Sequence, residues 1–314
     1  MEEESKDSSA DSNENLSNEL RGSEFAVAGL LFCFIFSQLV AMLIAPSFTK
    51  AEVQAFDNPE DPTNSFIYLL LIFAFTAMVL WLSRNKLIKI LHSIFLFAIA
   101  TTFIYVFYPF FFYFGYENNI GYIAASIVAF SLTAVLLYYP EWYIVNISGV
   151  LLSAGVAAIF GISFGWWPAI ILLTCLAIYD AWAVYRSGHM VDLADSVLDL
   201  RIPLLLVMPK SKTYSFLEHK NLHKQLEGKK KREAMFMGLG DIIIPGTLVV
   251  SSKISMGWSV GLGALCGSLI GFIILMSFVL KGKPQAGLPL LNGGAILGFF
   301  IMAFVTGGLD WNAI

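Results

Sequence analysis

The chain has 314 residues, of which 57% are hydrophobic and only 13% are charged, and its net charge is −4. A soluble domain carries about 25% charged residues, so this composition excludes a water-soluble globular protein. A bilayer is the remaining environment, and it requires apolar helices of roughly 20 residues. The length leaves room for about eight or nine of them.

The amino-terminal segment, residues 1–24, differs sharply from the rest. It holds eight acids against Lys6 and Arg21, with serines and asparagines between them. Such a composition cannot bury apolar surface, so we expect a disordered acidic tail. Its charge is also opposite to that of the first part of a signal peptide.

Apolar runs after the tail predict an all-α polytopic membrane protein with nine transmembrane helices. Their order divides the chain into the tail, six segments within 25–186, a basic loop at 187–233 and three segments within 234–314. The predicted segments are Phe25–Phe48, Asn64–Ser83, Leu87–Phe114, Gly121–Tyr139, Trp142–Ser163, Trp166–Tyr185, Ala234–Ser251, Trp258–Leu280 and Gly287–Gly307.

The positions of the 19 lysines and arginines predict the orientation. If the amino terminus is cytoplasmic, all of them except Lys50 and Lys253 lie on the cytoplasmic side, and ten fall between Arg186 and Glu233, which is the single long loop and the residue before it. Positive residues are enriched in cytoplasmic loops. We therefore expect a cytoplasmic amino terminus, an external carboxyl terminus and a cytoplasmic basic loop.

Two acids, Asp180 and Asp241, lie well inside apolar segments. A carboxylate at such a depth costs about 2.5 kcal/mol or more, and it marks a functional site by default. Asp180 lies six residues before Arg186, and Asp241 lies seven residues after Ala234. At 1.5 Å per residue both lie ~9 to 11 Å below the same membrane face. The sequence therefore predicts a facing pair.

The chemistry of such a pair follows from its coupling. Two carboxyl groups close together in a low-dielectric site do not both ionise easily, so they share one proton. The ionised carboxylate then activates a water molecule, while its protonated partner polarises a peptide carbonyl. Asp180 and Asp241 together therefore predict an aspartyl protease that needs neither metal nor cofactor.

Two backbone irregularities accompany the aspartates. Gly238, Leu239 and Gly240 precede Asp241, and glycines permit close helix approach and local departure from helical geometry. Ala286-Gly287-Leu288-Pro289 falls at a similar depth in the ninth segment, where the proline disfavours helix at Leu288. We expect an unwound, substrate-positioning strip there; the alternative is a proline at the start of an ordinary helix.

At this point the sequence resembles a known family. Tyr179-Asp180 and Gly238-Leu239-Gly240-Asp241 resemble the YD and GxGD motifs of the presenilin and signal peptide peptidase family of intramembrane aspartyl proteases. The nine segments, the large loop between the motifs and the orientation match the presenilin branch, and the short loops are most similar to an archaeal homologue. The resemblance begins at about the first segment and excludes the acidic tail.

One motif departs from the family pattern, because presenilins carry Pro-Ala-Leu-Pro where this chain has Ala286-Gly287-Leu288-Pro289. The resemblance implies that the substrates are transmembrane helices or residual signal peptides. It also implies that the substrate unwinds and pairs as a strand with enzyme backbone, next to the sixth segment and before Gly238. A multi-pass location in an archaeal plasma membrane is the expected setting.

The loop at 187–233 contains an apolar run, Ile202–Met208, that is too short to span a membrane. We expect this run to lie at the interface or to plug the site. By resemblance to presenilins the loop is an inhibitory or self-cleaved segment; a plain tether is the alternative.

Three other classes compete with the protease. A channel or proton-coupled transporter also uses buried aspartates. A prepilin-type peptidase places its first aspartate beside the membrane rather than within a segment, and a scaffold would not need two acids at one depth. We expect no metal, because the histidines and cysteines lack ligand spacing. We also expect no nucleic-acid partner, and the oligomeric state stays open.

Overall fold

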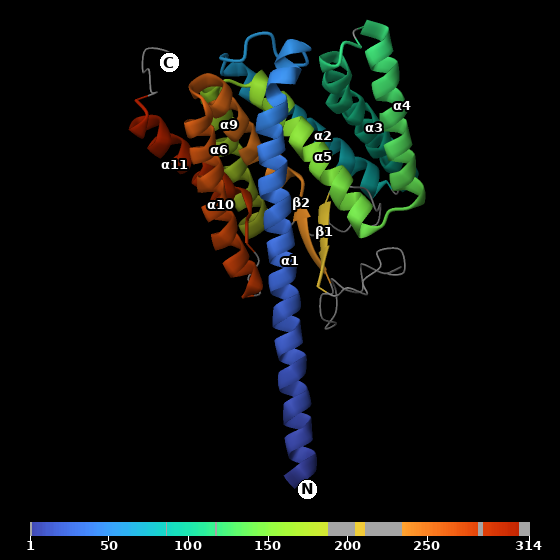
Figure 1. Ribbon diagram of the computed structural model, residues 1–314, viewed down its shortest axis with the longest axis vertical. Helices are drawn as coiled ribbons and strands as arrows, with labels where there is room; N and C mark the ends of the chain where they lie inside the picture. Colours follow the sequence, from blue (N-terminus) through green and yellow to red (C-terminus); the bar gives the residue numbers. More distant parts are fainter. Residues whose placement is uncertain are drawn as a thin grey trace.

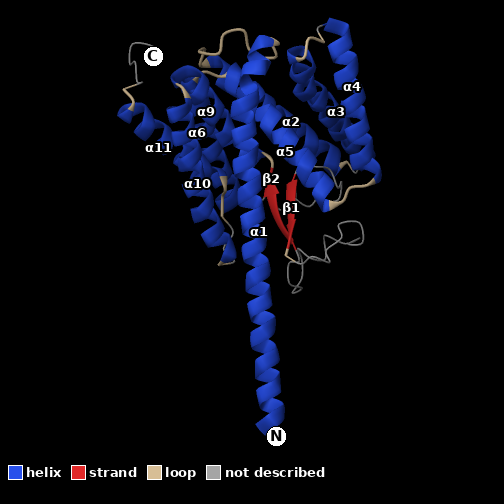
Figure 2. Ribbon diagram, in the orientation of Figure 1, coloured by secondary structure: helices blue, strands red, loops and turns tan. Residues whose placement is uncertain are grey.

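The computed structural model describes residues 2–85, 87–116, 118–187, 205–210, 234–281 and 285–307. Side chains of the first helix are described from Gly22 onward. The described chain is mostly helical, with one short two-stranded ribbon (Figures 1 and 2). Its helices are α1 (Glu2–Lys50), α2 (Thr63–Arg84), α3 (Ile88–Tyr113), α4 (Asn118–Tyr138), α5 (Trp142–Ser163), α6 (Trp166–Trp182), α9 (Gly240–Met256), α10 (Trp258–Leu280) and α11 (Leu288–Val305).

Most predicted segments coincide with these helices. The bounds of α5 and α10 agree with the prediction to the residue, and α2, α3, α4 and α11 agree within a few residues. Among the described residues, eight helices are long and apolar enough to cross a membrane. A multi-pass helical membrane protein is therefore confirmed.

The predicted seventh segment, Ala234–Ser251, is wrong at its start. Residues Ala234–Gly238 form strand β2, and helix α9 begins only at Gly240. A short apolar run suits a buried strand as well as a helix, and here a second apolar strand is available to pair with it. The predicted depth of Asp241 used helical rise from Ala234, so that calculation does not apply.

The acidic amino-terminal segment continues helix α1 instead of showing the disorder that its composition predicts. Extending an existing helix adds one hydrogen bond for each residue fixed, so polar residues can follow an apolar helix that is already formed. Acids near a helix amino terminus also complement the helix dipole. In Figure 1 this end of α1 projects far beyond the other helices.

The ribbon pairs β1 (Leu205–Pro209) with β2 in antiparallel register, so that Val207 lies opposite Phe236. Both strands lie beside α1, and β1 also lies beside α5 (Figure 1). Glycines make this approach possible. A Cβ on Gly29 of α1 would lie 2.6 Å from the Met208 side chain, and one on Gly149 of α5 would lie 2.9 Å from Leu206.

The apolar run Ile202–Met208 was expected at the interface or as a plug. Its last four residues are instead part of β1, and Leu206 and Val207 are almost fully buried. The rest of this run, and most of the basic loop, lie outside the described residues.

Helix α5 lies at the centre of the bundle. Its most apolar stretch is 67% buried, against 22% for α2, so α5 faces protein where α2 faces lipid. It packs against α1, α3, α9 and strand β1. It therefore connects the ribbon to α9, the helix that carries Asp241.

Helices α10 and α11 touch through their backbones. A Cβ on Gly267 would lie 2.1 Å from the Gly294 carbonyl oxygen, and one on Gly298 would lie 2.1 Å from the Gly263 carbonyl oxygen. Small residues allow such close crossings in membranes. Gly263 and Gly267 therefore serve packing, and their contacts fix α11 relative to α10.

Gly267→Ala should therefore lower the free energy of unfolding by about 1–3 kcal/mol, because its methyl group overlaps backbone rather than a movable side chain. The measurement is thermal unfolding of purified protein in detergent. Gly293→Ala is the matched control: it lies on α11, and its Cβ would meet nothing within 4 Å. Equal melting temperatures for the two variants would contradict the packing role.

Candidate active site

Asp180 lies near the carboxyl-terminal end of α6, and its side chain is only 5% exposed. Directly after α6 the backbone widens into a π-helical turn, η1 (Ala183–Ser187). Such turns are rare and occur frequently at functional sites. The neighbouring Tyr179 packs its ring edge-on against Phe73 of α2, at a centroid distance of 5.0 Å.

Asp241 lies in the first turn of α9, immediately after β2 and the residues Leu239 and Gly240. Its side chain is half-buried. The amino-terminal turn of a helix presents unpaired N–H groups and the positive end of the dipole, so this is a favourable place for a carboxylate. Pro245 has no N–H, so the main-chain carbonyl of Asp241 lacks its usual helical partner.

The start of α11 lies beside both carboxyl groups. The backbone N–H of Leu288 donates to Oδ2 of Asp180 at 3.0 Å, and the N–H of Gly287 faces the same carboxylate. A Cβ on Gly287 would lie 3.5 Å from Oδ1 of Asp241. One dipeptide therefore bonds to Asp180 of α6 and lies about a methyl group away from Asp241 of α9.

The other predicted site residues surround this pair to different degrees. A Cβ on Gly238 would lie 3.5 Å from Oδ2 of Asp241, whereas one on Gly240 would meet nothing within 4 Å. Leu239 is buried and meets Gly149 of α5, and Ala286 is buried before the start of α11. The structure thus brings the residues of both motifs to one place.

The expected unwound strip is shorter than predicted. Gln285–Gly287 are non-helical, but Leu288 and Pro289 already belong to α11. Proline is favoured in the first turn of a helix, where its missing N–H is not needed. Leu288 also lies in the first turn, so its N–H has no partner within the helix, and Asp180 accepts this N–H.

The aspartates are close enough to interact electrostatically. Two carboxyl groups that meet in a buried site can hold one proton between them, and this proton supplies both an acid and a base. Within the part of the chain that the structure describes, no three or more His, Cys, Asp or Glu side chains gather as a metal site would require. The geometry is that of acid–base hydrolysis.

Sequence reasoning missed Asn146, which lies on α5. Its side-chain amide donates to the Val207 carbonyl at 2.8 Å, and its Oδ1 accepts from the Val207 N–H at 2.8 Å. Asn146 therefore occupies one edge of β1, as a neighbouring strand would. The only available signal was a lone amide inside an otherwise apolar segment.

At the opposite edge of the ribbon, no other strand of the described residues pairs with β2. In an antiparallel pair, backbone groups alternate between facing the partner strand and facing away. Since Val207 faces Asn146, its opposite residue Phe236 presents N–H and C=O on the outer edge of β2. The described residues supply no third strand at this edge.

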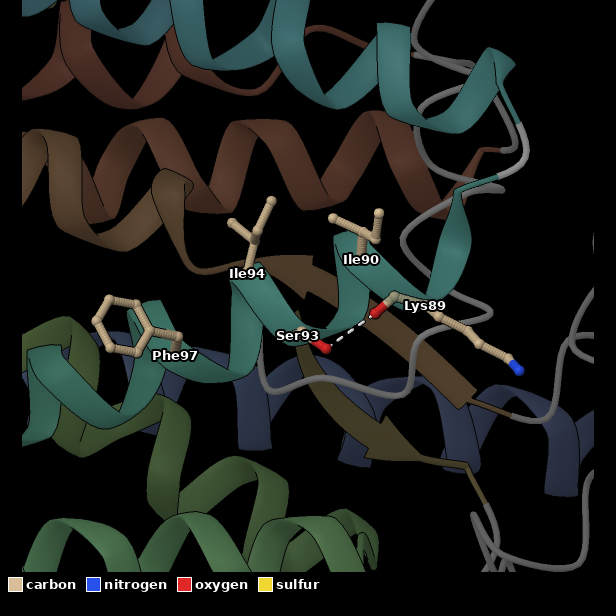
Figure 3. Close-up of a pocket in the computed structure, with 5 residues that line it drawn as sticks. All are labelled: Lys89, Ile90, Ser93, Ile94 and Phe97. Atoms are coloured by element: carbon tan, nitrogen blue, oxygen red, sulfur yellow. Dashed lines mark hydrogen bonds between the residues drawn. The ribbon is translucent and has the colours of Figure 1, made fainter.

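A separate hollow of about 400 Å³ lies along α3. Figure 3 shows its lining, in which the Ser93 hydroxyl donates to the Lys89 carbonyl oxygen at 3.0 Å. Neither aspartate nor any other predicted site residue lines it, so we assign it no part in the reaction.

Comparison with known proteins agrees with this geometry. The family model described as signal-peptide peptidase and presenilin aspartyl protease matches residues 31–308. Two crystal forms of a presenilin family intramembrane aspartate protease are similar, both with 35% identity. The match to the C222 form has a TM-score of 0.67 and covers 89% of this chain and 99% of that one. The match to the P2 form has a TM-score of 0.65 and covers 88% of this chain and 97% of that one. No curated protein matches.

Asn146→Leu should loosen β1, because it leaves the N–H and C=O of Val207 buried without partners. An unpaired buried group costs about 1–3 kcal/mol, so amide hydrogen exchange in Leu205–Pro209 should speed up roughly tenfold or more. Exchange measured by mass spectrometry tests this. Ser148→Ala is the control, since the buried Ser148 hydroxyl has no described partner to lose; similar exchange in both variants would refute the edge role.

Proposed function

The chain belongs to the signal-peptide peptidase and presenilin family of aspartyl proteases, and we propose that Asp180 and Asp241 form its catalytic pair. It is an intramembrane-cleaving aspartic endopeptidase, and a channel or transporter is not supported. The observation that carries the assignment of the pair is the Gly287–Leu288 dipeptide, which bonds to Asp180 and lies beside Asp241.

The reaction follows from one proton shared by two carboxyl groups. The ionised aspartate removes a proton from water as the oxygen attacks the peptide carbonyl, and the protonated aspartate donates to the carbonyl oxygen. The pair then gives its proton to the leaving nitrogen and takes one from a hydroxyl of the tetrahedral intermediate as the carbon–nitrogen bond breaks. The pair ends with one proton, ready for another cycle, so no covalent intermediate forms.

Substrates of this site are transmembrane helices or residual signal peptides. A helix hides its peptide bonds, so the segment to be cut must unwind and find new backbone partners, since unpaired groups are costly in lipid. The free edge of β2 offers such partners. It leads through Gly238 directly to Asp241, and this continuity supports strand addition next to the pair.

The departure from the family's Pro-Ala-Leu-Pro pattern is compatible with this role. A Cβ on Gly287 would meet Asp241 and Leu275 at no closer than 3.5 Å, which is ordinary contact. The alanine found in presenilins therefore fits at this position. We keep Ala286, Gly287, Leu288 and Pro289 as the substrate-positioning element, together with Tyr179, Gly238, Leu239 and Gly240.

We further propose nine membrane segments with a cytoplasmic amino terminus, with α9 as the seventh, in an archaeal plasma membrane. The basic residues of the loop at 187–233 support this orientation. In Figure 1 the amino-terminal end of α1 and the carboxyl-terminal end of α11 lie at opposite ends of the molecule, as an odd number of crossings requires. We keep the division of the chain into an amino-terminal tail, six segments, a basic loop and three further segments, with the seventh segment now starting at α9. An inhibitory segment, a self-cleaved segment and a plain tether are the alternatives for the loop.

Asp180→Asn and Asp241→Asn should each reduce cleavage by at least about 10³-fold, because neither an acid nor a base can be replaced by an amide. The assay incubates purified protein in detergent with a transmembrane peptide and analyses the products by mass spectrometry. A transition-state analogue of aspartyl proteases should block the reaction.

Asp61→Asn is the matched control for these substitutions. Asp61 lies between α1 and α2 and accepts the Thr63 N–H at 2.9 Å, a bond that holds the pKa of this carboxyl below its ordinary value. The substitution therefore removes a charge there too, and cleavage should stay unchanged. Cleavage that persists without either Asp180 or Asp241 would overturn the assigned pair.

The orientation is testable with single cysteines introduced at Asp57 and at Lys212, after the three native cysteines are replaced. A membrane-impermeant maleimide added to intact cells should label the cysteine at Asp57 and leave the one at Lys212 unlabelled until the cells are opened. The reverse pattern would invert the proposed topology.

A further inference from the structure

Helix α11 meets α6 through two polar contacts. One is the bond from the Leu288 N–H to Asp180. In the other, the side-chain amide of Asn292 donates to the Leu173 carbonyl oxygen at 2.9 Å. Neither contact was foreseen from the sequence, and the second lies outside both family motifs.

The two contacts form one antiparallel register between the helices. Leu288 and Asn292 are four residues apart and share a face of α11, while Leu173 and Asp180 are seven residues apart and share a face of α6. Side chains lean toward the start of their helix, whereas carbonyl groups point toward its end. Along α6, the Asp180 carboxyl and the Leu173 carbonyl are therefore closer together than seven residues of helix would suggest. Their separation matches that of Leu288 and Asn292, which are four residues apart on α11.

Fold stability does not account for an asparagine at this position. Its side chain is fully buried, and within the described residues its Oδ1 has no hydrogen-bond partner. A buried unpaired oxygen costs about 1–3 kcal/mol. Leucine has a similar size and would fill the space without this cost. The Leu173 carbonyl, inside α6, also has a helical N–H available to it.

We propose that Asn292 is a positioning residue, which sets the height and rotation of α11 on α6 so that Gly287 and Leu288 lie between the two aspartates. The proposal rests on the assigned catalytic pair. The glycine contacts with α10 fix α11 on its other side, but they leave α6 free to slide or turn. Asn292 removes that freedom at one point, about one turn from the site.

The functional consequence is a sensitivity of the reaction step rather than of binding. Displacing a catalytic group by about 1 Å can cost roughly 10²-fold in rate. The Asn292 side-chain amide bonds to the Leu173 carbonyl and not to a site residue, so a substrate should still bind beside β2 when this amide is removed. The expected defect is therefore in kcat, with KM nearly unchanged.

The test compares Asn292→Leu with Asn292→Gln in the detergent cleavage assay. Asn292→Leu should lower kcat by about 10- to 100-fold, shift KM by less than about threefold and leave the melting temperature equal or higher. Asn292→Gln keeps the donor on a longer arm and should recover part of kcat. Asn292→Met replaces the leucine variant if that variant does not fold.

Ser252→Ala is the matched control. Ser252 is also fully buried, but its hydroxyl bonds within its own helix α9, to Leu248. This variant should keep its kcat. Wild-type kcat in Asn292→Leu would overturn the positioning role. So would parallel losses of kcat and melting temperature with no advantage for glutamine, because that result describes packing alone.

Asp180→Asn, assayed alongside, separates the two proposals. If it still cleaves, the assigned pair is wrong whatever Asn292 does. If it is inactive while Asn292→Leu behaves like the wild type, only the positioning role fails.

Discussion

The hydrogen bond between the Leu288 N–H and the Asp180 carboxylate joins two requirements that a bilayer imposes. A helix that begins inside the membrane leaves its first N–H groups without partners, and a carboxylate at that depth lacks water. The N–H supplies a donor to the carboxylate and the carboxylate supplies an acceptor to the N–H, in a charge-assisted hydrogen bond. The site therefore depends on α6 and α11 staying in register, and the helices around them serve that register. Helix α10 holds α11 through glycine backbones, and α5 carries the ribbon that ends beside Asp241.

The sequence predicted most helix positions and the two site aspartates, because hydrophobicity and the cost of burying charge reveal both. Helix bounds such as Trp142–Ser163 follow from apolar length, and Asp180 and Asp241 stand out because carboxylates are rare in apolar segments. The strand at Ala234–Gly238 was not predictable in this way, because Met235-Phe236-Met237 suits either conformation and its partner lies across a loop of more than twenty residues. Pairing with β1, which is distant in the sequence, makes this segment a strand. Hydropathy does not reveal such pairing.

The missed residues share one property. Asn146 and Asn292 are uncharged, so composition and motif analysis pass over them, yet each is a fully or almost fully buried amide that bonds to the backbone of a different element. An amide in a membrane segment is costly unless it is paired. Here the pairing fixes a strand edge in one case and a helix register in the other. Aspartates identify the chemistry of this protein, and asparagines fix its geometry.

The short helix α9 has a consequence for where a substrate is cut. Its 17 residues rise about 26 Å, which is less than the ~30 Å of a hydrocarbon core. In the proposed orientation the far end of α9 lies at the external surface, so its first turn lies beneath the cytoplasmic surface and β2 enters the membrane to reach it. The length of α9 thus sets the depth of Asp241, measured from the external side. One added helical turn would move Asp241 by about 5.4 Å and select a different peptide bond in the same substrate.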